Sequence, residues 1–387
     1  MTTMADNKDK KVLNVPHLRF PEFSGEWEKC KLGDIATGFD YGMNAAAKPF
    51  DGENKYIRIT DIDEASSTYI DKDIVSPDGT LTENYLVNDR DILLARTGAS
   101  TGKSYLYRKS DGKLYYAGFL IRANVTKHNP YFVFSQLHTH RYWSWVSIMS
   151  ARSGQPGINS QEYSSFPVYV TSLREEEKIS ALLSLIDERI ATQNKIIEDL
   201  KLLKSAIAET VFNNMKGHLT TNLSTICNIV KGKQVNGEEL SEKGKYYVMN
   251  GGITPSGYYD QCNTPDNTIS ISEGGNSCGY VQYNKSSFWS GGHCYTLQDI
   301  TCGVDIQYLF HYLKRYESNI MNLRIGTGLP NIQKKDLENF RIELPPSNVQ
   351  KEIATCLTAI EHKILVEINW LDSVQKEKKH LLRQMFI

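Results

Sequence analysis

The sequence predicts an α+β protein built from two similar halves, each a mixed α/β globular domain followed by one long helix. Three observations support this prediction: an internal repeat, a seven-residue spacing of apolar residues in two long stretches, and short strand-like runs between glycine and proline turns. A pseudo-twofold relation between the halves would make the two helices antiparallel neighbours in a coiled coil. The spacing by itself leaves a parallel pair open.

The repeat is most regular in the second part of each half. Pro156, Ile158, Phe166 and Phe212 each have an identical residue 174 positions later. Further upstream, the glycine pair Gly98 and Gly102 corresponds to Gly275 and Gly279. The predicted division is a tail over 1–17, a first domain over 18–171, a helix over 172–216, a second domain over 217–345, and a helix over 346–387.

The two long stretches carry the strongest periodic signal. Apolar residues alternate in steps of four and three, which keeps one seam of a helix facing a partner helix. The seam is interrupted by a polar residue at matching places, Gln193 with Glu367 and Lys204 with Lys378. Each stretch predicts a helix of about 40 residues, about 60 Å long. The apolar seam residues are Ile179, Leu183, Ile186, Ile190, Ile197, Leu200, Ile353, Leu357, Ile360, Ile364, Leu371 and Val374.

Local signals refine the element boundaries. Ser172 with Glu175, and Ser347 with Gln350, predict capping boxes at the two helix starts. Strands are expected at 55–60, 91–95, 268–271 and 340–344, and aromatic-rich helices at 130–148 and 306–320. The globular halves are therefore expected to contain small, irregular sheets.

Composition excludes several classes of protein. The 387 residues are 40% hydrophobic and 23% charged, with a formal net charge of -1, as in an ordinary globular protein. No stretch reaches the eighteen apolar residues of a membrane helix, so no membrane partner is expected. Seven cysteines without a Cys-x-x-Cys pair, and no secretory segment, predict a cytoplasmic protein.

Two motifs suggest chemistry that their spacing does not support. The run from Gly98 to Ser104 ends in Gly-Lys-Ser, but only three residues separate its glycines, where a phosphate-binding loop has four. Its counterpart has Tyr280 in place of Lys103, so nucleotide hydrolysis is a weak alternative. His293 with Cys278, Cys294 and Cys302 lacks the spacing of a zinc site, and buried thiols with a satisfied histidine are expected instead. No catalytic residue and no metal site are predicted.

The turns at 153–159 and 327–332 are better candidates for binding. Small and polar residues before a strand let the backbone approach a DNA duplex, and amide side chains can hydrogen-bond to base edges. A tight structural turn is nearly as good an interpretation. The candidate DNA-binding residues in and around these turns are Arg58, Arg96, Gly98, Lys103, Arg152, Gly154, Gln155 and Asn159 in the first half, and Lys231, Lys233, Lys285, Arg324, Gly328, Asn331 and Gln333 in the second.

The order of these elements is similar to that of the specificity subunits of type I restriction-modification enzymes. The run from Val15 to Trp27, the following Lys31–Ile35, the Arg96-Thr-Gly98 loop, the glycine- and proline-containing turns and the helix after each half resemble that family over residues 15–387. One departure is Glu273, which stands where the first half has Arg96.

The resemblance implies a function and partners. Residues 18–167 and 218–341 would be target recognition domains, and the helices would be conserved spacers that pair as an antiparallel coiled coil. Partners would be double-stranded DNA, two modification (methyltransferase) subunits and restriction (endonuclease/translocase) subunits. S-adenosylmethionine and ATP would bind those subunits, with no cofactor in this chain.

Two unlike recognition domains on helices of fixed length would read a bipartite, asymmetric target with an unread gap. The alternative from another class is a structural or adaptor protein that displays two protein- or glycan-binding domains on a coiled coil. A DNA-binding protein loses duplex affinity steeply as salt is added, whereas an aromatic protein-binding surface does not.

Overall fold

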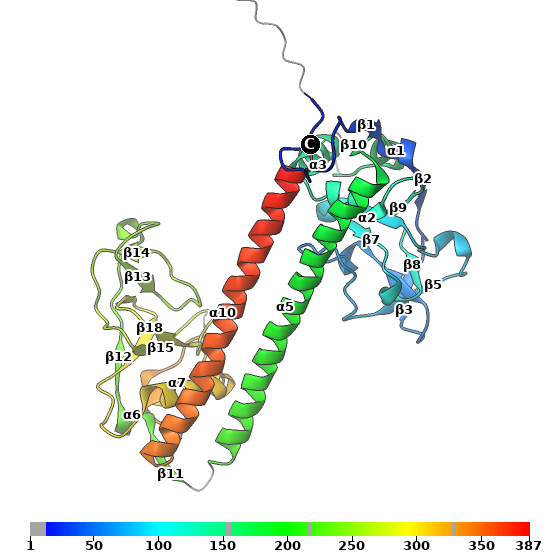
Figure 1. The fold of residues 1–387 in the computed structure, drawn as a ribbon. Helices are drawn as coiled ribbons and strands as arrows, with labels where there is room; N and C mark the ends of the chain where they lie inside the picture. Colours follow the sequence, from blue (N-terminus) through cyan, green and yellow to red (C-terminus); the bar gives the residue numbers. More distant parts are fainter. Residues whose placement is uncertain (1–12, 152–155, 216–217, 327, 329) are drawn as a thin grey trace, which may run out of the picture. The chain divides into compact units, whose positions relative to one another are not determined.

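A computed structural model describes residues 13–151, 156–215, 218–326, 328 and 330–387. The chain divides into two compact units, Met1–Gln193 with Trp370–Ile387, and Asn194–Asn369. Each unit contains one globular half and a segment of each long helix (Figure 1). We call them the first and the second unit.

The first unit has a four-stranded antiparallel sheet in the order β2-β9-β6-β7. Smaller pairs are β1-β10 and β3-β5, both antiparallel, and β4-β8, which is parallel. The elements are β1 (Glu28–Lys31), α1 (Leu32–Ile35), β2 (Ala36–Tyr41), β3 (Ala46–Pro49), β4 (Lys55–Ile57), η1 (Ile59–Asp61), β5 (Val75–Asp78), η2 (Glu83–Tyr85), β6 (Asp91–Ala95), η3 (Gly98–Ser100), β7 (Ser104–Leu106), η4 (Lys109–Asp111), β8 (Leu114–Tyr116), β9 (Leu120–Val125), α2 (Pro130–Gln136), α3 (His140–Ser150), α4 (Ser160–Ser164) and β10 (Pro167–Val170).

The second unit repeats this plan with a four-stranded antiparallel sheet in the order β12-β18-β15-β16 and a two-stranded β11-β19 pair. A three-stranded sheet, β14-β13-β17, replaces the other pairs. The elements are β11 (Leu219–Asn222), α6 (Leu223–Ile226), β12 (Asn228–Lys231), η5 (Gly237–Glu239), β13 (Tyr246–Met249), β14 (Tyr258–Tyr259), β15 (Thr268–Ser272), β16 (Val281–Asn284), β17 (Trp289–Ser290), β18 (Cys294–Gln298), α7 (Ile306–Arg315), α8 (Glu317–Met321), α9 (Lys334–Glu338) and β19 (Arg341–Leu344). The predicted α+β class with two repeated halves is confirmed.

The core of each unit lies around the central strand of its main sheet. All five residues of β6 and all five of β15 are buried. In the first unit, Ile92 and Leu94 join one apolar cluster, while Leu93 and Ala95 join another, because successive side chains of a strand point to opposite faces. The central strands therefore hold the loops that follow them in fixed positions.

Two of the predicted helices are broken. The stretch 130–148 forms α2 and α3, because the hydroxyl of Thr139 accepts a hydrogen bond from the backbone N–H of Tyr142 and starts a new helix. The stretch 306–320 likewise forms α7 and α8, which meet at Tyr316. Aromatic content alone did not reveal these breaks.

The long helices are α5 (Leu173–Asn213, 41 residues) and α10 (Ser347–Met385, 39 residues), each about 60 Å long. In the first unit, Ile179 and Leu183 near the start of α5 share a buried cluster with Leu382 and Met385 at the end of α10. In the second unit, the end of α5 shares a buried cluster with the start of α10, through Phe212 and Ile353 among others. The predicted antiparallel pairing is confirmed within each unit.

The seam residues face inward along both helices. Ile179, Leu183, Ile197, Ile353 and Leu357 are buried, and the seam residues Ile186, Ile190, Leu200, Ile360, Ile364, Leu371 and Val374 are half-buried. Gln193 is also buried. The seven-residue spacing therefore marks the less exposed side of each helix.

The lysines that interrupt the seams form ion pairs with the opposite helix. Lys378 Nζ lies 2.5 Å from Asp187 Oδ1 in the first unit, and Lys204 Nζ lies 3.1 Å from Glu361 Oε2 in the second. Lys204 lies 17 residues after Asp187, and Glu361 lies 17 residues before Lys378, so both pairs obey one antiparallel register. The polar interruptions therefore specify how the helices align.

A buried side chain fixes the start of each long helix to its own globular domain. In the first unit, Glu176 Oε2 accepts a hydrogen bond from the backbone N–H of Asn129 (2.9 Å), which caps α2. In the second, Gln350 Oε1 accepts one from the backbone N–H of Asp305 (2.9 Å), which caps α7. The contact is the same in both units, although one side chain is a carboxylate and the other an amide.

The predicted capping boxes are therefore wrong in detail. Ser172 does accept a hydrogen bond from the backbone of Glu175 (3.4 Å), but the Glu175 carboxylate binds Arg19. Ser347 is the first helical residue of α10, and the side chain of Gln350 is engaged with Asp305. The side chains of Glu175 and Gln350 form tertiary contacts, so they do not cap the backbone of their own helices.

The Asp187–Lys378 pair offers a test of register. Both side chains are about one-fifth exposed, so alanine at either position is expected to lower the free energy of unfolding by about 1–2 kcal/mol. The double variant should lose less than the sum of the single losses, because the second substitution removes a charge that already lacks its partner. A double-mutant cycle by urea unfolding measures this coupling, and additive losses would contradict the pairing.

His311 predicts a dependence of stability on pH. Its side chain is 2% exposed, with Nε2 3.0 Å from the hydroxyl of Thr358, and burial lowers its pKa from 6.5 to about 4, with Lys204 acting in the same direction and Glu361 opposing it. Between these values the unfolded chain binds the proton and the folded chain does not, so stability falls as the pH drops from 6.5 towards 4. About 2 kcal/mol should be lost at this site by pH 5.

Urea unfolding at pH 7 and pH 5 measures this loss. His311→Gln should show a smaller loss between the two values than the unaltered chain. His362→Gln, at an exposed histidine of α10, is the matched control and should leave the pH dependence unchanged. Equal pH dependence in all three proteins would show that His311 does not stay neutral.

Candidate nucleic-acid interface

The glycine loop and the proline turn, which the sequence suggested separately, are hydrogen-bonded to each other in both units. In the first unit, the N–H of Gly98 donates to the carbonyl of Pro156 (3.1 Å), and the N–H of Ile158 donates to the carbonyl of Arg96 (2.9 Å). The central strands β6 and β15 end next to these loops, so the sheets hold the loops in place.

The second unit repeats both hydrogen bonds. The N–H of Gly275 donates to the carbonyl of Pro330 (3.0 Å), and the N–H of Ile332 donates to the carbonyl of Glu273 (2.9 Å). The same two loops therefore form one structure in each unit.

A third turn completes the group. The N–H of Arg96 donates to the carbonyl of Phe119 (3.1 Å), and the N–H of Glu273 donates to the carbonyl of His293 (2.9 Å). We call the three segments together the loop cluster: residues 96–103, 117–119 and 156–159 in the first unit, and residues 273–280, 291–293 and 330–333 in the second.

The two glycines of each loop have different roles. A Cβ on Gly102 would lie 2.8 Å from Val146, and one on Gly279 would lie 2.8 Å from the Cα of Met321, so these glycines let a helix pack closely. Gly98 and Gly275 have positive φ angles, +67° and +76°, and a Cβ on either would meet nothing within 4 Å. The first glycine of each pair therefore leaves open space beside the backbone.

The side chains around the two clusters differ in charge. In the first unit the Arg96 guanidinium lies over the ring of Tyr41, 4.7 Å from its centroid. In the second unit Glu273 accepts from Lys231 (2.6 Å) and from the hydroxyl of Tyr295 (3.1 Å). His293 Nδ1 lies 3.5 Å from the other oxygen of Glu273.

Backbone hydrogen bonds show that Tyr41 and Lys231 occupy matching positions. The residue after each, Gly42 or Gly232, donates to the first residue of the matching strand, Leu120 of β9 or Cys294 of β18. The first unit thus places its cation on the glycine loop and the second on the neighbouring strand. The departure at Glu273 is explained by this exchange, because Lys231 places a cation beside the second cluster where Glu273 has replaced the arginine of the first.

The other predicted DNA-binding residues lie in varied surroundings. Arg58 is paired with Asp61 (2.7 Å) and Lys103 with Glu64 (3.3 Å). Asn159 caps α4 by accepting a hydrogen bond from the N–H of Glu162 (2.9 Å). Lys233, Lys285, Arg324, Gly328, Asn331 and Gln333 lie at exposed positions. Arg152, Gly154 and Gln155 lie outside the described residues, and a role in DNA binding stays a prediction for the whole set.

Sequence reasoning missed Phe119 and misjudged His293. Phe119 is 56% exposed, and the side chain of His293 is 64% exposed, whereas a satisfied histidine was expected. Cys278 and Cys294 are buried as expected, but Cys302 is exposed. A signal was present, because Gly118-Phe119 and Gly292-His293 occupy matching places at the repeat offset of 174 residues.

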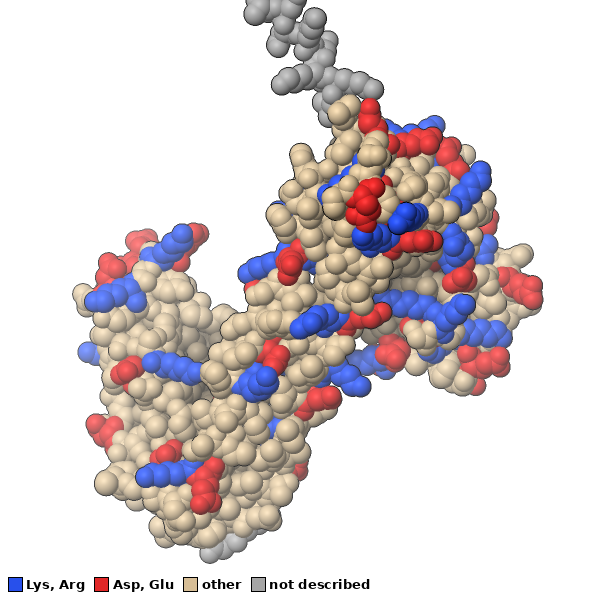
Figure 2. All heavy atoms as spheres, in the orientation of Figure 1, with Lys and Arg blue, Asp and Glu red and all other residues tan. Residues whose placement is uncertain are grey.

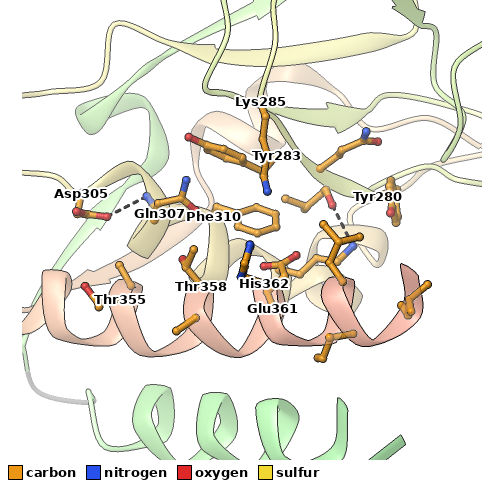
Figure 3. A pocket seen from close by; sticks show the side chains of 18 of the residues that line it. Tyr280, Tyr283, Lys285, Asp305, Gln307, Phe310, Thr355, Thr358, Glu361 and His362 are labelled. Atoms are coloured by element: carbon orange, nitrogen blue, oxygen red, sulfur yellow. Dashed lines mark hydrogen bonds between the residues drawn. The ribbon is translucent and has the colours of Figure 1, made fainter. Parts of the chain in front are cut away.

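The second unit also contains a groove of about 940 Å³ between α10 and the globular half (Figure 3). Phe310 and Tyr283 lie on one side of the groove, and Glu361 and His362 of α10 on the other. Lys285, one of the predicted DNA-binding residues, lines this groove. Lys285 does not belong to any of the three segments of the loop cluster.

The groove marks a difference between the repeats. In the first unit the hydroxyl of Tyr131 donates to Asp187, whereas Gln307, the corresponding residue of the second unit, lines the open groove. The shorter side chain leaves space where the first unit has an aromatic ring.

Two features that the described residues lack bear on other classes of function. Over these ranges no group of three or more histidine, cysteine, aspartate or glutamate side chains is arranged to hold a metal ion. Within the same part of the chain, no helix combines the length and apolar character needed to span a bilayer.

Comparisons with known proteins agree on one family. A family model described as "Type I restriction modification DNA specificity domain" matches residues 24–202 and again residues 216–373. A putative type I specificity subunit of Mycoplasma pneumoniae is 35% identical over 154 residues, and one of Mycoplasma genitalium is 32% identical over 164 residues. These matches cover 38% and 41% of this chain, and only 41% and 43% of those relatives.

Other similarities extend over nearly the whole chain. A putative specificity subunit of the MjaX type I restriction enzyme from Methanocaldococcus jannaschii is 25% identical over 95% of both chains. The crystal structure of a type I restriction-modification S subunit from M. genitalium superposes with a TM-score of 0.71 and 18% identity, covering 96% of this chain and 99% of that one. That structure supports the fold.

The two glycines of the second unit can be separated experimentally. Gly279→Ala places a Cβ against the backbone of Met321 and should lower the free energy of unfolding by about 3 kcal/mol. Gly275→Ala meets only the strain of its positive φ and should cost about 1 kcal/mol. Urea unfolding of both variants compares the losses, and equal losses would contradict the packing role given to Gly279.

Proposed function

Because the chain belongs to the type I restriction modification DNA specificity family, we propose that each of its units reads one half of a bipartite, asymmetric DNA target. The observation that carries this proposal is the repeated loop cluster, which has the same backbone hydrogen bonds in both units but different exposed side chains. One backbone frame with two sets of side chains suits two unlike half-sites.

The loop cluster and its neighbours carry the kinds of chemical groups that bind DNA. Gly98 and Gly275 leave room beside the backbone, while Arg96 in the first cluster and Lys231 beside the second supply cations. Backbone amides and cations position a protein on phosphates, while side chains at the groove identify bases. The sheet behind each cluster holds these groups in a fixed arrangement.

Charge supports a role within a larger complex. The net charge is -1, and on the face shown in Figure 2 lysine and arginine side chains are interspersed with aspartate and glutamate. Phosphate neutralisation supplies much of the affinity of a DNA-binding protein. We therefore propose that this chain selects the sequence and that partner subunits contribute much of the affinity.

The proposed partners are two modification subunits and the restriction subunits of a type I system. In this assignment the chain performs no chemical step itself, and S-adenosylmethionine and ATP bind the partner subunits. The seven cysteines are free thiols, which suits a reducing compartment, so we place the complex in the cytoplasm.

The test is selection of duplexes from a random pool by the chain together with its modification subunits. We expect two separated, unlike half-sites, and binding that decreases steeply with salt concentration. The chain alone should bind the selected duplex poorly. Failure of the complex to enrich any sequence would contradict the proposal, and binding without salt dependence would favour an adaptor that displays protein- or glycan-binding domains.

A further inference from the structure

We propose that Phe119 and His293, at matching positions of the two loop clusters, contact bases and make the two units read different half-sites. This inference rests on the proposed function and adds to it the residues that give each unit its own specificity. Neither residue was among the positions that the sequence suggested for DNA binding.

Both side chains project from a fixed backbone. In the first unit, the N–H of Gly118 donates to the carbonyl of Met43 (2.8 Å), and the carbonyl of Phe119 accepts from Arg96. In the second, the N–H of His293 donates to Asn250 Oδ1 (3.1 Å), and its carbonyl accepts from Glu273. Such anchoring reduces the entropy lost when a side chain binds a ligand.

The exposure of the two rings has no structural explanation in the described residues. More than half of each side chain is exposed, and Phe119 belongs to none of the apolar clusters formed by those residues. A phenylalanine ring that contacts water gains nothing for folding, since burial is what makes it favourable. Both rings are therefore available to contact another molecule.

Because the backbone is the same in both clusters, the side chains of residues 119 and 293 are what differ between them. The carbonyls of residues 119 and 293 accept from the residue that follows the central strand, Arg96 or Glu273. A duplex that docks on both clusters in the same way would place equivalent groups next to residue 119 and next to residue 293. The two units then differ in what that residue can recognise.

The chemistry of the two rings predicts different preferences. The apolar ring of Phe119 can contact a thymine methyl group or insert beside a base step. The His293 imidazole carries two ring nitrogens, and Nδ1 lies 3.5 Å from Glu273 Oε2. Ring nitrogens can hydrogen-bond to base edges in the major groove, which the apolar ring of Phe119 cannot do.

The neighbouring residues suit this arrangement. The Arg96 guanidinium lies over Tyr41 in the first unit, and Lys231 binds Glu273, which also faces His293, in the second, so each unit has a cation at or beside its loop cluster that can bind a phosphate. Gly98 and Gly275 leave open space nearby. Each unit thus combines a cation that can position the protein on a phosphate with a ring that can distinguish bases.

The experiment compares base preferences of the assembled complex. Phe119→Ala and His293→Ala are each combined with the modification subunits, and duplexes are selected from a random pool. Each variant should lose about tenfold in discrimination at one or two adjacent base pairs of one half-site. The other half-site should be read as before, which also shows that the variant is folded and assembled.

Exchanged and control variants sharpen the result. Phe119→His and His293→Phe should change the preferred base at the affected positions and not merely weaken it. Phe50→Ala and His362→Ala, at an exposed phenylalanine and an exposed histidine outside the loop clusters, should leave both half-sites unchanged.

Two outcomes overturn the inference. The first is unchanged preference at every position in both alanine variants, and the second is equal loss at both half-sites, which indicates a structural role. Either is distinct from failure of the proposed function, in which the unaltered complex selects no sequence at all.

Discussion

The structure depends on a buried hydrogen bond that joins each long helix to its own globular domain. Glu176 in α5 and Gln350 in α10 lie in the first turn of their helices, and each accepts the backbone N–H of the residue that caps a domain helix. Glu176 also lies 2.8 Å from His128 Nδ1, and Gln350 donates to the carbonyl of Pro345 (2.9 Å). These bonds fix the direction in which each helix leaves its domain, so the remaining contacts in each unit follow from them.

In each unit, the C-terminal end of the other long helix also packs against the globular domain. Phe386, just after α10, packs against Trp27 and Phe132 in the first unit, and Phe212 of α5 packs against Tyr308 and Tyr312 in the second. A helix start anchored by a hydrogen bond and a helix end anchored by an aromatic ring require antiparallel order. The ion pairs of Lys204 and Lys378 then select one register among the possible ones.

Much of the fold could be predicted from the sequence because it rests on periodic signals. The seam spacing gave the two helices, and Lys204 and Lys378 were recognisable as polar interruptions. Their partners Asp187 and Glu361 were not, because they occupy no special place in the spacing. The breaks at Thr139 and Tyr316 were missed since they depend on capping and local packing.

The candidate site was less accessible to sequence reasoning. The glycine loop and the proline turn were found, but their hydrogen bonds join residues more than fifty positions apart. In the sequence, Glu273 at the position of Arg96 suggested that the second unit lacks a cation here. The structure places Lys231, on the neighbouring strand, beside Glu273. His293 was misjudged because exposure depends on the turn that carries it, and a single histidine has no pattern that predicts its surroundings.

Ion pairing within the chain bears on the proposed recognition of DNA by a nearly neutral protein. Arg58 is paired with Asp61, Lys103 with Glu64 and Lys231 with Glu273, so these cations are partly neutralised within the chain. In the proposed function, each would exchange a carboxylate for a phosphate, which would limit the affinity that does not depend on sequence. Contacts to bases then account for a larger share of the difference between targets. A subunit whose task is discrimination benefits from that balance, because tight binding to any duplex would hold it away from its own sites.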